Sequence, residues 1–165
     1  MSEDKKWYAI YTKPRWEKKV NDLLTRKRIE SYCPLNRVRR RWKDRTKTVH
    51  EPLFKSYVFV CVSEAEKGEV RFTDGVVNFV YWERKPAVIR HEEIETIKKF
   101  LRDYDDVEVR PVSLNEGQRV RIKTGVMMNK EGLVVQIKGN RAVVVIESLG
   151  YELTAQFEKR NLEPV

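Results

Sequence analysis

The chain has 165 residues, of which 41% are hydrophobic and 10% aromatic, enough apolar material for a packed core. Charged residues make up 36%, but both signs are mixed, which excludes wholesale disorder. The net charge of +9 and the isoelectric point near 9.6 indicate an anionic partner. No apolar stretch approaches the roughly 18 residues of a membrane span, and no signal segment follows the charged N-terminus. We therefore expect a cytoplasmic protein.

The positive charge is concentrated in the first part of the chain. Residues 1–104 hold 25 Lys and Arg against 16 Asp and Glu, whereas residues 105–165 hold 9 of each. Because Lys and Arg neutralise phosphates, any contact with nucleic acid is expected in the first part.

Neither the cysteines nor the histidines form a catalytic or metal-binding pattern. Cys33 and Cys61 lack the spacing of a metal site and lie in predicted strands, which favours buried, reduced thiols. His50 and His91 are far apart and have no nucleophile or carboxylate arrangement around them. No phosphate-binding glycine loop and no paired catalytic carboxylates are found. We expect a protein that is not an enzyme and uses no metal or cofactor.

The first segments of the chain alternate between strand and helix patterns. Residues 7–11 are aromatic and apolar and predict a strand. A helix is predicted over 14–28, because Pro14 suits the first helical position and apolar side chains from Trp16 to Leu24 recur on one face. Residues 29–38 predict a strand that a proline interrupts.

The next segments complete a mixed fold. The uninterrupted apolar run 57–62 predicts a central strand that is buried on both faces. Ser63 and Glu66 match a capping box that opens a short helix. A strand is predicted over 76–82, and a helix that begins at Glu92 follows it. The element order predicts an α+β domain, in which one antiparallel sheet is flanked by helices.

The C-terminal third has a different pattern. Residues 105–115 show no periodicity and predict a linker. Short alternating runs separated by glycines then predict a small β-barrel. Its predicted strands are 119–123, 133–137, 142–146 and 151–157. The predicted division is therefore a first domain over 1–104, a linker over 105–115 and a barrel over 116–165.

The run from Arg37 to Lys47 holds seven basic residues and one acid, and predicts a hairpin tip or a mobile loop. One interpretation is a solvated loop without a dedicated partner. The other is a surface that follows phosphates, with Trp42 stacking on an unpaired base if its ring is exposed. The candidate nucleic-acid residues are Arg37, Arg39, Arg40, Arg41, Trp42, Lys43 and Arg45, and Lys13 and Arg15 on the predicted helix extend the same basic face.

Segments in the first and the last part of the chain resemble the NusG family. Trp7-Tyr8 in a first strand, a helix with basic residues and the stretch Pro52–Val60 resemble its N-terminal domain. The stretch Gly117–Ile122, followed by Gly125 and Glu131–Val134, resembles the KOW motif, which is built around one glycine, here Gly132. The resemblance spans about residues 7–165.

Within that family the chain is more similar to the specialised paralogues, such as RfaH and the UpxY-type antiterminators of polysaccharide operons. The residues that carry this resemblance are Tyr8–Lys19 and Tyr32–Leu35. Three positions depart from the common pattern. Lys55-Ser56 stands where Pro-Gly is usual, Val126–Met128 replaces a Pro-Phe-Ala-like stretch, and Leu149 replaces an aromatic residue.

The resemblance implies a transcription elongation or antitermination factor, expected to be a monomer. An exposed aromatic cluster would receive the clamp helices of RNA polymerase, although core burial is the alternative for each member: Trp7, Tyr8, Phe54 and Tyr57. The basic run would lie beside upstream or non-template DNA. The barrel would recruit ribosomal protein S10 or Rho through Ile146, Leu149 and Tyr151.

Two alternatives to this interpretation remain. One is a general, housekeeping NusG elongation and termination factor. The other is a ribosome-associated, RNA-binding KOW protein, which the zero net charge of the barrel disfavours. Because β-branched runs such as Arg141–Ile146 disfavour helix, we predict that the barrel does not refold into helices.

Overall fold

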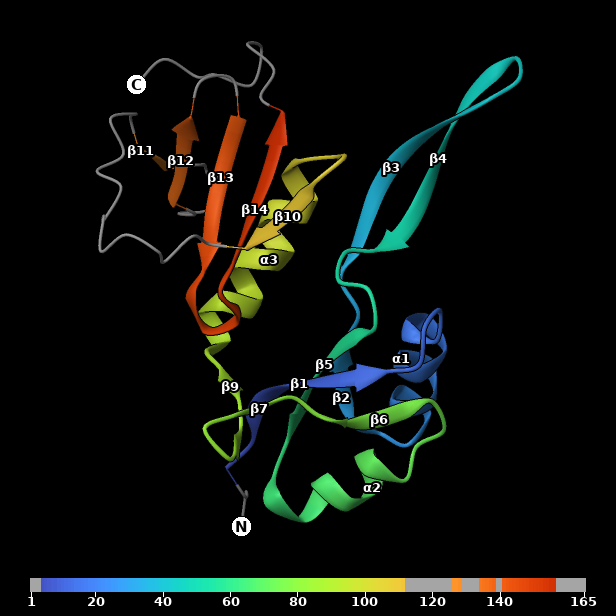
Figure 1. Ribbon diagram of the computed structural model, residues 1–165, viewed down its shortest axis with the longest axis vertical. Coiled ribbons are helices and arrows are strands. Elements are labelled where there is room, and N and C mark those ends of the chain that lie inside the picture. Colours follow the sequence, from blue (N-terminus) through green and yellow to red (C-terminus); the bar gives the residue numbers. More distant parts are fainter. Residues whose placement is uncertain (1–3, 112–125, 129–133, 139–140, 157–165) are drawn as a thin grey trace. The chain divides into compact units, whose positions relative to one another are not determined.

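A computed structural model describes residues 4–111, 126–128, 134–138 and 141–156 (Figure 1). The chain divides into two compact units. The first comprises Met1–Leu35 and Pro52–Glu95, and the second Asn36–Glu51 and Thr96–Val165. The predicted KOW glycine, Gly132, and the predicted strand 119–123 lie outside the described residues.

The first unit is built on an antiparallel sheet in the order β2-β5-β1-β6, with β9 also paired to β1. Its strands are β1 (Lys6–Thr12), β2 (Glu30–Tyr32), β5 (Tyr57–Val62), β6 (Val76–Phe79) and β9 (Val88–Ile89). A short hairpin joins β7 (Tyr81–Trp82) to β8 (Lys85–Pro86). Its helical elements are α1 (Glu17–Arg26), the 3-10 turn η1 (Glu64–Glu66) and α2 (Lys67–Arg71). Helix α3 (His91–Asp103) begins in the first unit and continues into the second from Thr96 onward.

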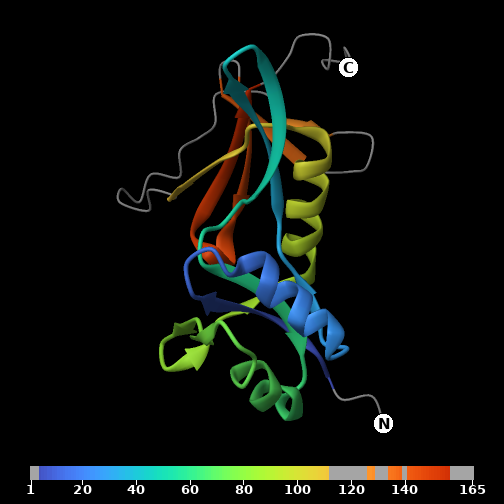
Figure 2. The same cartoon turned by 90° about the vertical axis from the view of Figure 1, so that its right-hand side faces the viewer.

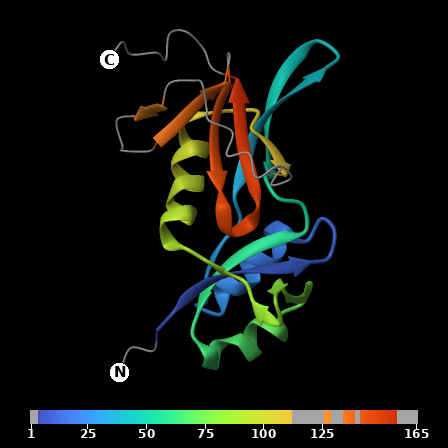
Figure 3. The ribbon, with the colours of Figure 1, turned by 60° about the vertical axis from the view of Figure 1, so that its left-hand side comes forward.

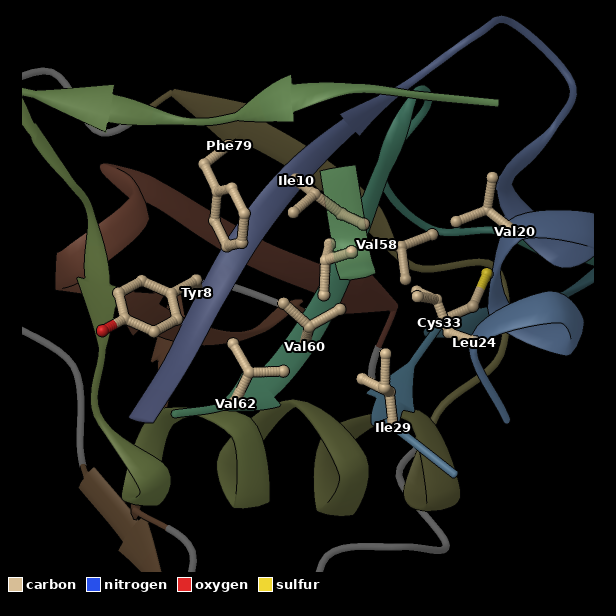
Figure 4. Close-up of a cluster of buried hydrophobic side chains, with 11 residues drawn as sticks. Tyr8, Ile10, Val20, Leu24, Ile29, Cys33, Val58, Val60, Val62 and Phe79 are labelled. Atoms are coloured by element: carbon tan, nitrogen blue, oxygen red, sulfur yellow. The ribbon is translucent and has the colours of Figure 1, made fainter. Parts of the chain in front are cut away.

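The apolar run 57–62 forms the central strand β5, as its composition predicts. Val58, Val60 and Val62 are fully buried on one face, and Phe59 is buried on the other. Figure 4 shows these valines beside Tyr8 and other side chains of one hydrophobic cluster. Burying each of these apolar side chains stabilises the fold by about 1.5–3 kcal/mol.

Helix α1 begins later than the sequence predicts. The prediction of a helix start at Pro14 is wrong, because Arg15 has a φ of 68°, in the left-handed region that a right-handed helix cannot include. The helix ends where a Schellman motif forms. Arg28 takes a φ of 62°, its N–H donates to Thr25 O, and Ile29 N–H donates to Leu24 O.

The capping box and the interrupted strand are confirmed. Ser63 N–H donates to Glu66 Oε1 at 3.1 Å, ahead of α2. The predicted strand 29–38 is split into β2 and β3 (Leu35–Trp42). The predicted strand 76–82 is likewise divided into β6 and β7.

The second unit contains a long hairpin of β3 with β4 (Arg45–Pro52), drawn in blue to teal in Figure 2. It also holds a five-stranded antiparallel sheet in the order β10-β14-β13-β12-β11. Its strands are β10 (Glu108–Pro111), β11 (Val126–Met128), β12 (Val134–Lys138), β13 (Arg141–Ile146) and β14 (Tyr151–Gln156), with the 3-10 turn η2 (Glu147–Leu149) between the last two. Figure 3 shows β13 and β14 side by side in orange and red.

This sheet agrees with three of the predicted strands and corrects the predicted linker. Residues 108–111 are not a linker, because β10 pairs with β14 from Glu108↔Thr154 to Pro111↔Tyr151. Among the described residues of the C-terminal third, the regular structure is strand and one 3-10 turn, with no α-helix after α3.

Candidate nucleic-acid and polymerase interfaces

The basic run forms a β-hairpin, one of the two outcomes that the sequence predicts. Strand β3 ends at Trp42, Lys43 and Asp44 make the turn, and β4 starts at Arg45. The Trp42 side chain is 62% exposed at this tip. The ring therefore does not pack inward, and its faces are open to a base or another planar group.

The base of the hairpin has a different environment from the tip. The Arg37 guanidinium donates from Nε to Asp105 Oδ1 at 2.6 Å. It also donates to three carbonyl oxygens at the end of α3, those of Leu101 (2.7 Å), Arg102 (3.0 Å) and Tyr104 (3.3 Å). A cation is favourable at this end of a helix, where carbonyl groups lack partners within the helix. The assignment of Arg37 to nucleic-acid binding is therefore replaced by a structural role.

A buried amide strengthens the same base. Asn36 Nδ2 donates to Val107 O at 2.8 Å, and Val107 N–H donates back to Asn36 Oδ1 at 3.0 Å. Asp106 adds two further bonds, since its N–H donates to Arg37 O and its Oδ1 accepts the Arg39 N–H. The hairpin is thus fastened to the segment that leads into β10.

The middle of the hairpin carries exposed ion pairs. Arg40 Nε donates to Glu51 Oε1 at 3.0 Å, and Arg39 lies 3.9 Å from Asp105. Both arginine side chains are more than half exposed. Exposed pairs of this kind contribute only about 0–1 kcal/mol, so a phosphate can replace the carboxylate at small cost.

The tip carries four more cations: Arg41, Lys43, Arg45 and Lys47, all exposed. Within the part of the chain that the structure describes, no hydrogen bond or ion pair engages these four side chains. Their charge is compensated only by solvent and salt, the condition under which phosphate binding releases counterions.

Lys13 and Arg15 lie in the first unit, in the loop between β1 and α1. Both are exposed. Lys13 and Lys19 place their ammonium groups 5.5 and 4.4 Å from the Trp16 ring, a cation–π arrangement. Because the hairpin belongs to the other unit, a single basic face that joins the two stays a prediction.

Three of the four predicted aromatic contact residues are core residues. Trp7, Tyr8 and Phe54 are each at most 5% exposed. Tyr8 packs edge-on against Phe79, and Phe54 edge-on against Phe59, with ring centroids 5.7 and 5.6 Å apart. The expectation that these three form an exposed cluster is wrong, because apolar rings of this size stabilise the fold most when they are buried.

Tyr57 remains accessible, with a partner that the sequence reasoning missed. Tyr57 is half-buried and lies opposite Tyr11 in the β1–β5 pairing. The two ring centroids are 5.0 Å apart, and Tyr11 is 39% exposed. Strand alternation alone places Tyr11 on one face with Trp7, but the register that brings it beside Tyr57 depends on pairing between distant segments.

The three predicted contact residues of the C-terminal sheet divide similarly. Ile146 is fully buried, so it belongs to the core and is not a contact residue. Leu149, in η2, and Tyr151, in β14, are partly accessible. Val145, one residue before Ile146, is 38% exposed and was missed.

The prediction of buried thiols is confirmed for Cys33 but wrong for Cys61, which is half-buried. Burial raises the pKa of the Cys33 thiol to about 11, and burial likewise raises that of Cys61. Both shifts favour the protonated thiol over the thiolate, which is the form that acts as nucleophile or metal ligand. In the described ranges no cluster of three or more His, Cys, Asp or Glu could hold a metal ion, and no helix is long and apolar enough to cross a membrane.

Comparison with known proteins gives a consistent result. Residues 5–98 match the family model described as transcription termination factor nusG. The transcription termination/antitermination protein NusG of Streptococcus pyogenes serotype M1 is 30% identical over 172 residues, covering 95% of this chain and 94% of that protein. NusG of Staphylococcus aureus strain N315 is 30% identical over 183 residues, covering 99% of both.

A solved structure supports the fold alone. The structure titled "Domain interaction in Thermotoga maritima NusG" matches with a TM-score of 0.54 and 21% identity, covering 93% of each chain. With the family model and the relatives of matching length, the conclusion is direct: the chain belongs to the NusG family of transcription termination and antitermination proteins.

Proposed function

We propose that this protein binds RNA polymerase through the tyrosine pair Tyr11–Tyr57 and binds DNA through the tip of its β3–β4 hairpin. The clamp helices of the polymerase are the proposed partner of the pair. The upstream duplex or the non-template strand is the proposed partner of the tip. Such a factor would hold the DNA against the polymerase and reduce pausing.

The observation that carries the proposed DNA contact is the exposure of the cations and the indole ring at the hairpin tip. Arg41, Lys43, Arg45 and Lys47 are exposed beside the open Trp42 ring. Cations can follow a backbone while an aromatic face stacks on an unpaired base, worth about 1–3 kcal/mol per base. A single-stranded segment would use both features, so the non-template strand is the favoured ligand.

The observation that supports the polymerase contact is the pair of accessible tyrosines at the edge of an otherwise buried face. Aromatic side chains that keep a polar hydroxyl are common at the centre of protein interfaces. The experiment is capture of core RNA polymerase by the full chain and by Tyr57→Ala. Tyr81→Ala is the matched control, since Tyr81 is an exposed tyrosine of the same unit.

We expect wild type and Tyr81→Ala to retain polymerase and Tyr57→Ala to lose most of it, with the circular dichroism of all three unchanged. Equal retention by Tyr57→Ala would contradict the proposed contact. No retention by wild type would favour the ribosome-associated alternative.

We further propose that the protein is a specialised antiterminator and not a general factor. The support is the basic hairpin with Trp42 at its tip, a surface suited to selecting a DNA segment. The similarity to NusG proteins over nearly the whole length is the observation that favours the general alternative. RNA sequencing after deletion of the gene separates the two, because a specialised factor alters a few operons and a general factor alters most long transcripts.

For the C-terminal sheet we propose a second partner, ribosomal protein S10 or Rho, bound near Leu149 and Tyr151 with Val145. Tethering that partner to the polymerase raises its local concentration without a new contact. Capture of purified S10 and of purified Rho by the full chain, with Val145→Glu as the disrupting variant, would identify which of them binds.

A further inference from the structure

The turn that precedes Tyr57 is held in an unusual backbone conformation. Ser56 has a φ of 65°, in the left-handed region where side chains other than glycine are strained. Ser56 is not a glycine, so the surrounding structure must over-determine this conformation.

Two hydrogen bonds fix Ser56 from both sides. Its N–H donates to Glu17 Oε2 at 2.9 Å, and its C=O accepts the Thr12 N–H at 2.9 Å. Thr12 is the last residue of β1, directly after Tyr11, and Glu17 is the first residue of α1. The turn is therefore attached to the end of the strand and the start of the helix that flank the tyrosine pair.

The Glu17 side chain is buried where it accepts the Ser56 N–H bond. It is only 5% exposed, although it carries a carboxylate. A buried carboxylate needs hydrogen-bond donors, and a charge-assisted bond to a backbone N–H is among the stronger ones. The loop that contains Gly75 is bonded to the same region, since Lys13 N–H donates to Gly75 O at 2.8 Å.

We infer that Glu17 is a positioning residue for the polymerase contact. Its carboxylate holds Ser56 in the left-handed conformation and so fixes the Tyr57 ring beside Tyr11. This inference rests on the proposed function, because it assigns a role to Tyr57. A glycine at position 56 would take the same conformation without strain and would not need the carboxylate.

The test compares full-length variants by two readouts. Hydrogen exchange of the Ser56 amide reports the positioning bond, and the dissociation constant for core polymerase reports the contact. Glu17→Ala removes the acceptor. Asp22→Asn is the matched control, because Asp22 is an exposed acid of the same helix that pairs with Arg26 one turn away. Ser56→Gly is combined with Glu17→Ala as the rescue.

We expect Glu17→Ala to accelerate exchange of the Ser56 amide at least tenfold and to weaken polymerase binding about tenfold, while Asp22→Asn changes neither more than twofold. Adding Ser56→Gly should bring polymerase binding back to within about threefold of wild type, even though the amide bond stays lost. A general loss of stability at Glu17 would not by itself weaken polymerase binding, because a variant that stays folded by circular dichroism presents the same interface.

The outcomes separate the inference from the proposed function. If Tyr57→Ala weakens polymerase binding but Glu17→Ala does not, although Ser56 exchange accelerates, the positioning role is overturned and the contact stands. If the Ser56→Gly rescue fails while the double variant is folded, the inference is also overturned. If Tyr57→Ala itself leaves binding unchanged, the proposed contact has failed and the inference fails with it.

Discussion

The base and the tip of the β3–β4 hairpin are made of the same residue types but have opposite environments. At the base, Arg37 and Asn36 together hydrogen-bond six backbone or carboxylate groups between Leu101 and Val107. At the tip, Arg41 and its neighbours face solvent. An arginine-rich run is therefore not uniform, since its first arginine is part of the fold and its later cations are available to a ligand.

The largest expected effect comes from breaking the base. Asn36→Leu leaves the buried N–H and C=O of Val107 without partners, and each such group costs about 1–3 kcal/mol. We expect the free energy of unfolding, measured with urea, to fall by about 3 kcal/mol. Arg41→Ala, an exposed change at the tip, should alter it by less than about 0.5 kcal/mol. Similar values for both variants would remove the distinction between base and tip.

A smaller effect is expected from neutralising the tip. The variant changes four residues to Gln: Arg41, Lys43, Arg45 and Lys47. If each neutralises one phosphate, the slope of log K against log salt for single-stranded DNA should fall by about 3, and affinity at physiological salt on the order of 100-fold.

The control for that variant removes the same charge from the first unit. It changes four other exposed cations to Gln: Arg26, Arg28, Arg84 and Lys85. It should retain at least a third of the wild-type affinity. An equal loss in both variants would mean that net charge, and not the hairpin tip, determines binding.

Next in size is the Trp42 ring. Trp42→Ala should weaken binding to single-stranded DNA roughly tenfold, the lower part of the range of about 1–3 kcal/mol for one stacked base. The salt slope should not change, because no charge is lost. Trp42→Phe should recover most of the affinity. Quenching of tryptophan fluorescence on titration with DNA gives a direct reading, and no quenching would contradict stacking.

The smallest expected effect is a difference in salt slope between one arginine of the base and one of the tip, and it tests the comparison of base and tip most directly. Arg37→Gln and Arg41→Gln remove the same charge from one strand. Because Arg37 is already paired with Asp105, its loss should leave the salt slope for DNA nearly unchanged, whereas loss of Arg41 should lower the slope by about 0.7. Equal slopes for the two variants would show that Arg37 leaves its pairing to contact phosphate.

Much of the local structure could be predicted because it depends on neighbouring residues. The apolar run 57–62, the capping box at Ser63 and the strands β13 and β14 each follow from spacing within one segment. The start of α1 was missed, because Pro14 satisfies the first-turn preference while the left-handed Arg15 that follows it does not.

What could not be predicted depends on residues far apart in the chain. Asn36 and Val107 are 71 positions apart, and the residues of β10 acquire a strand partner only when β14 is placed beside them. The candidate site shows the same limit. Composition identified the cations and aromatics, but only tertiary contacts separate Arg37 from Arg41, or the buried Trp7 from the accessible Tyr11.

The bonds at the hairpin base also determine where the chain can be cut. A fragment that ends at Tyr104, at the composition boundary, would carry the whole hairpin but lose two residues that hold its base. These are Asp105, which pairs with Arg37, and Val107, whose N–H and C=O both bond Asn36. Extending the fragment through Pro111 restores those bonds but leaves the edge of β10 without β14. A shortened protein would thus have either a hairpin with a weakened base or an unpaired strand edge that can pair with another chain. DNA-binding assays should therefore use the full-length chain.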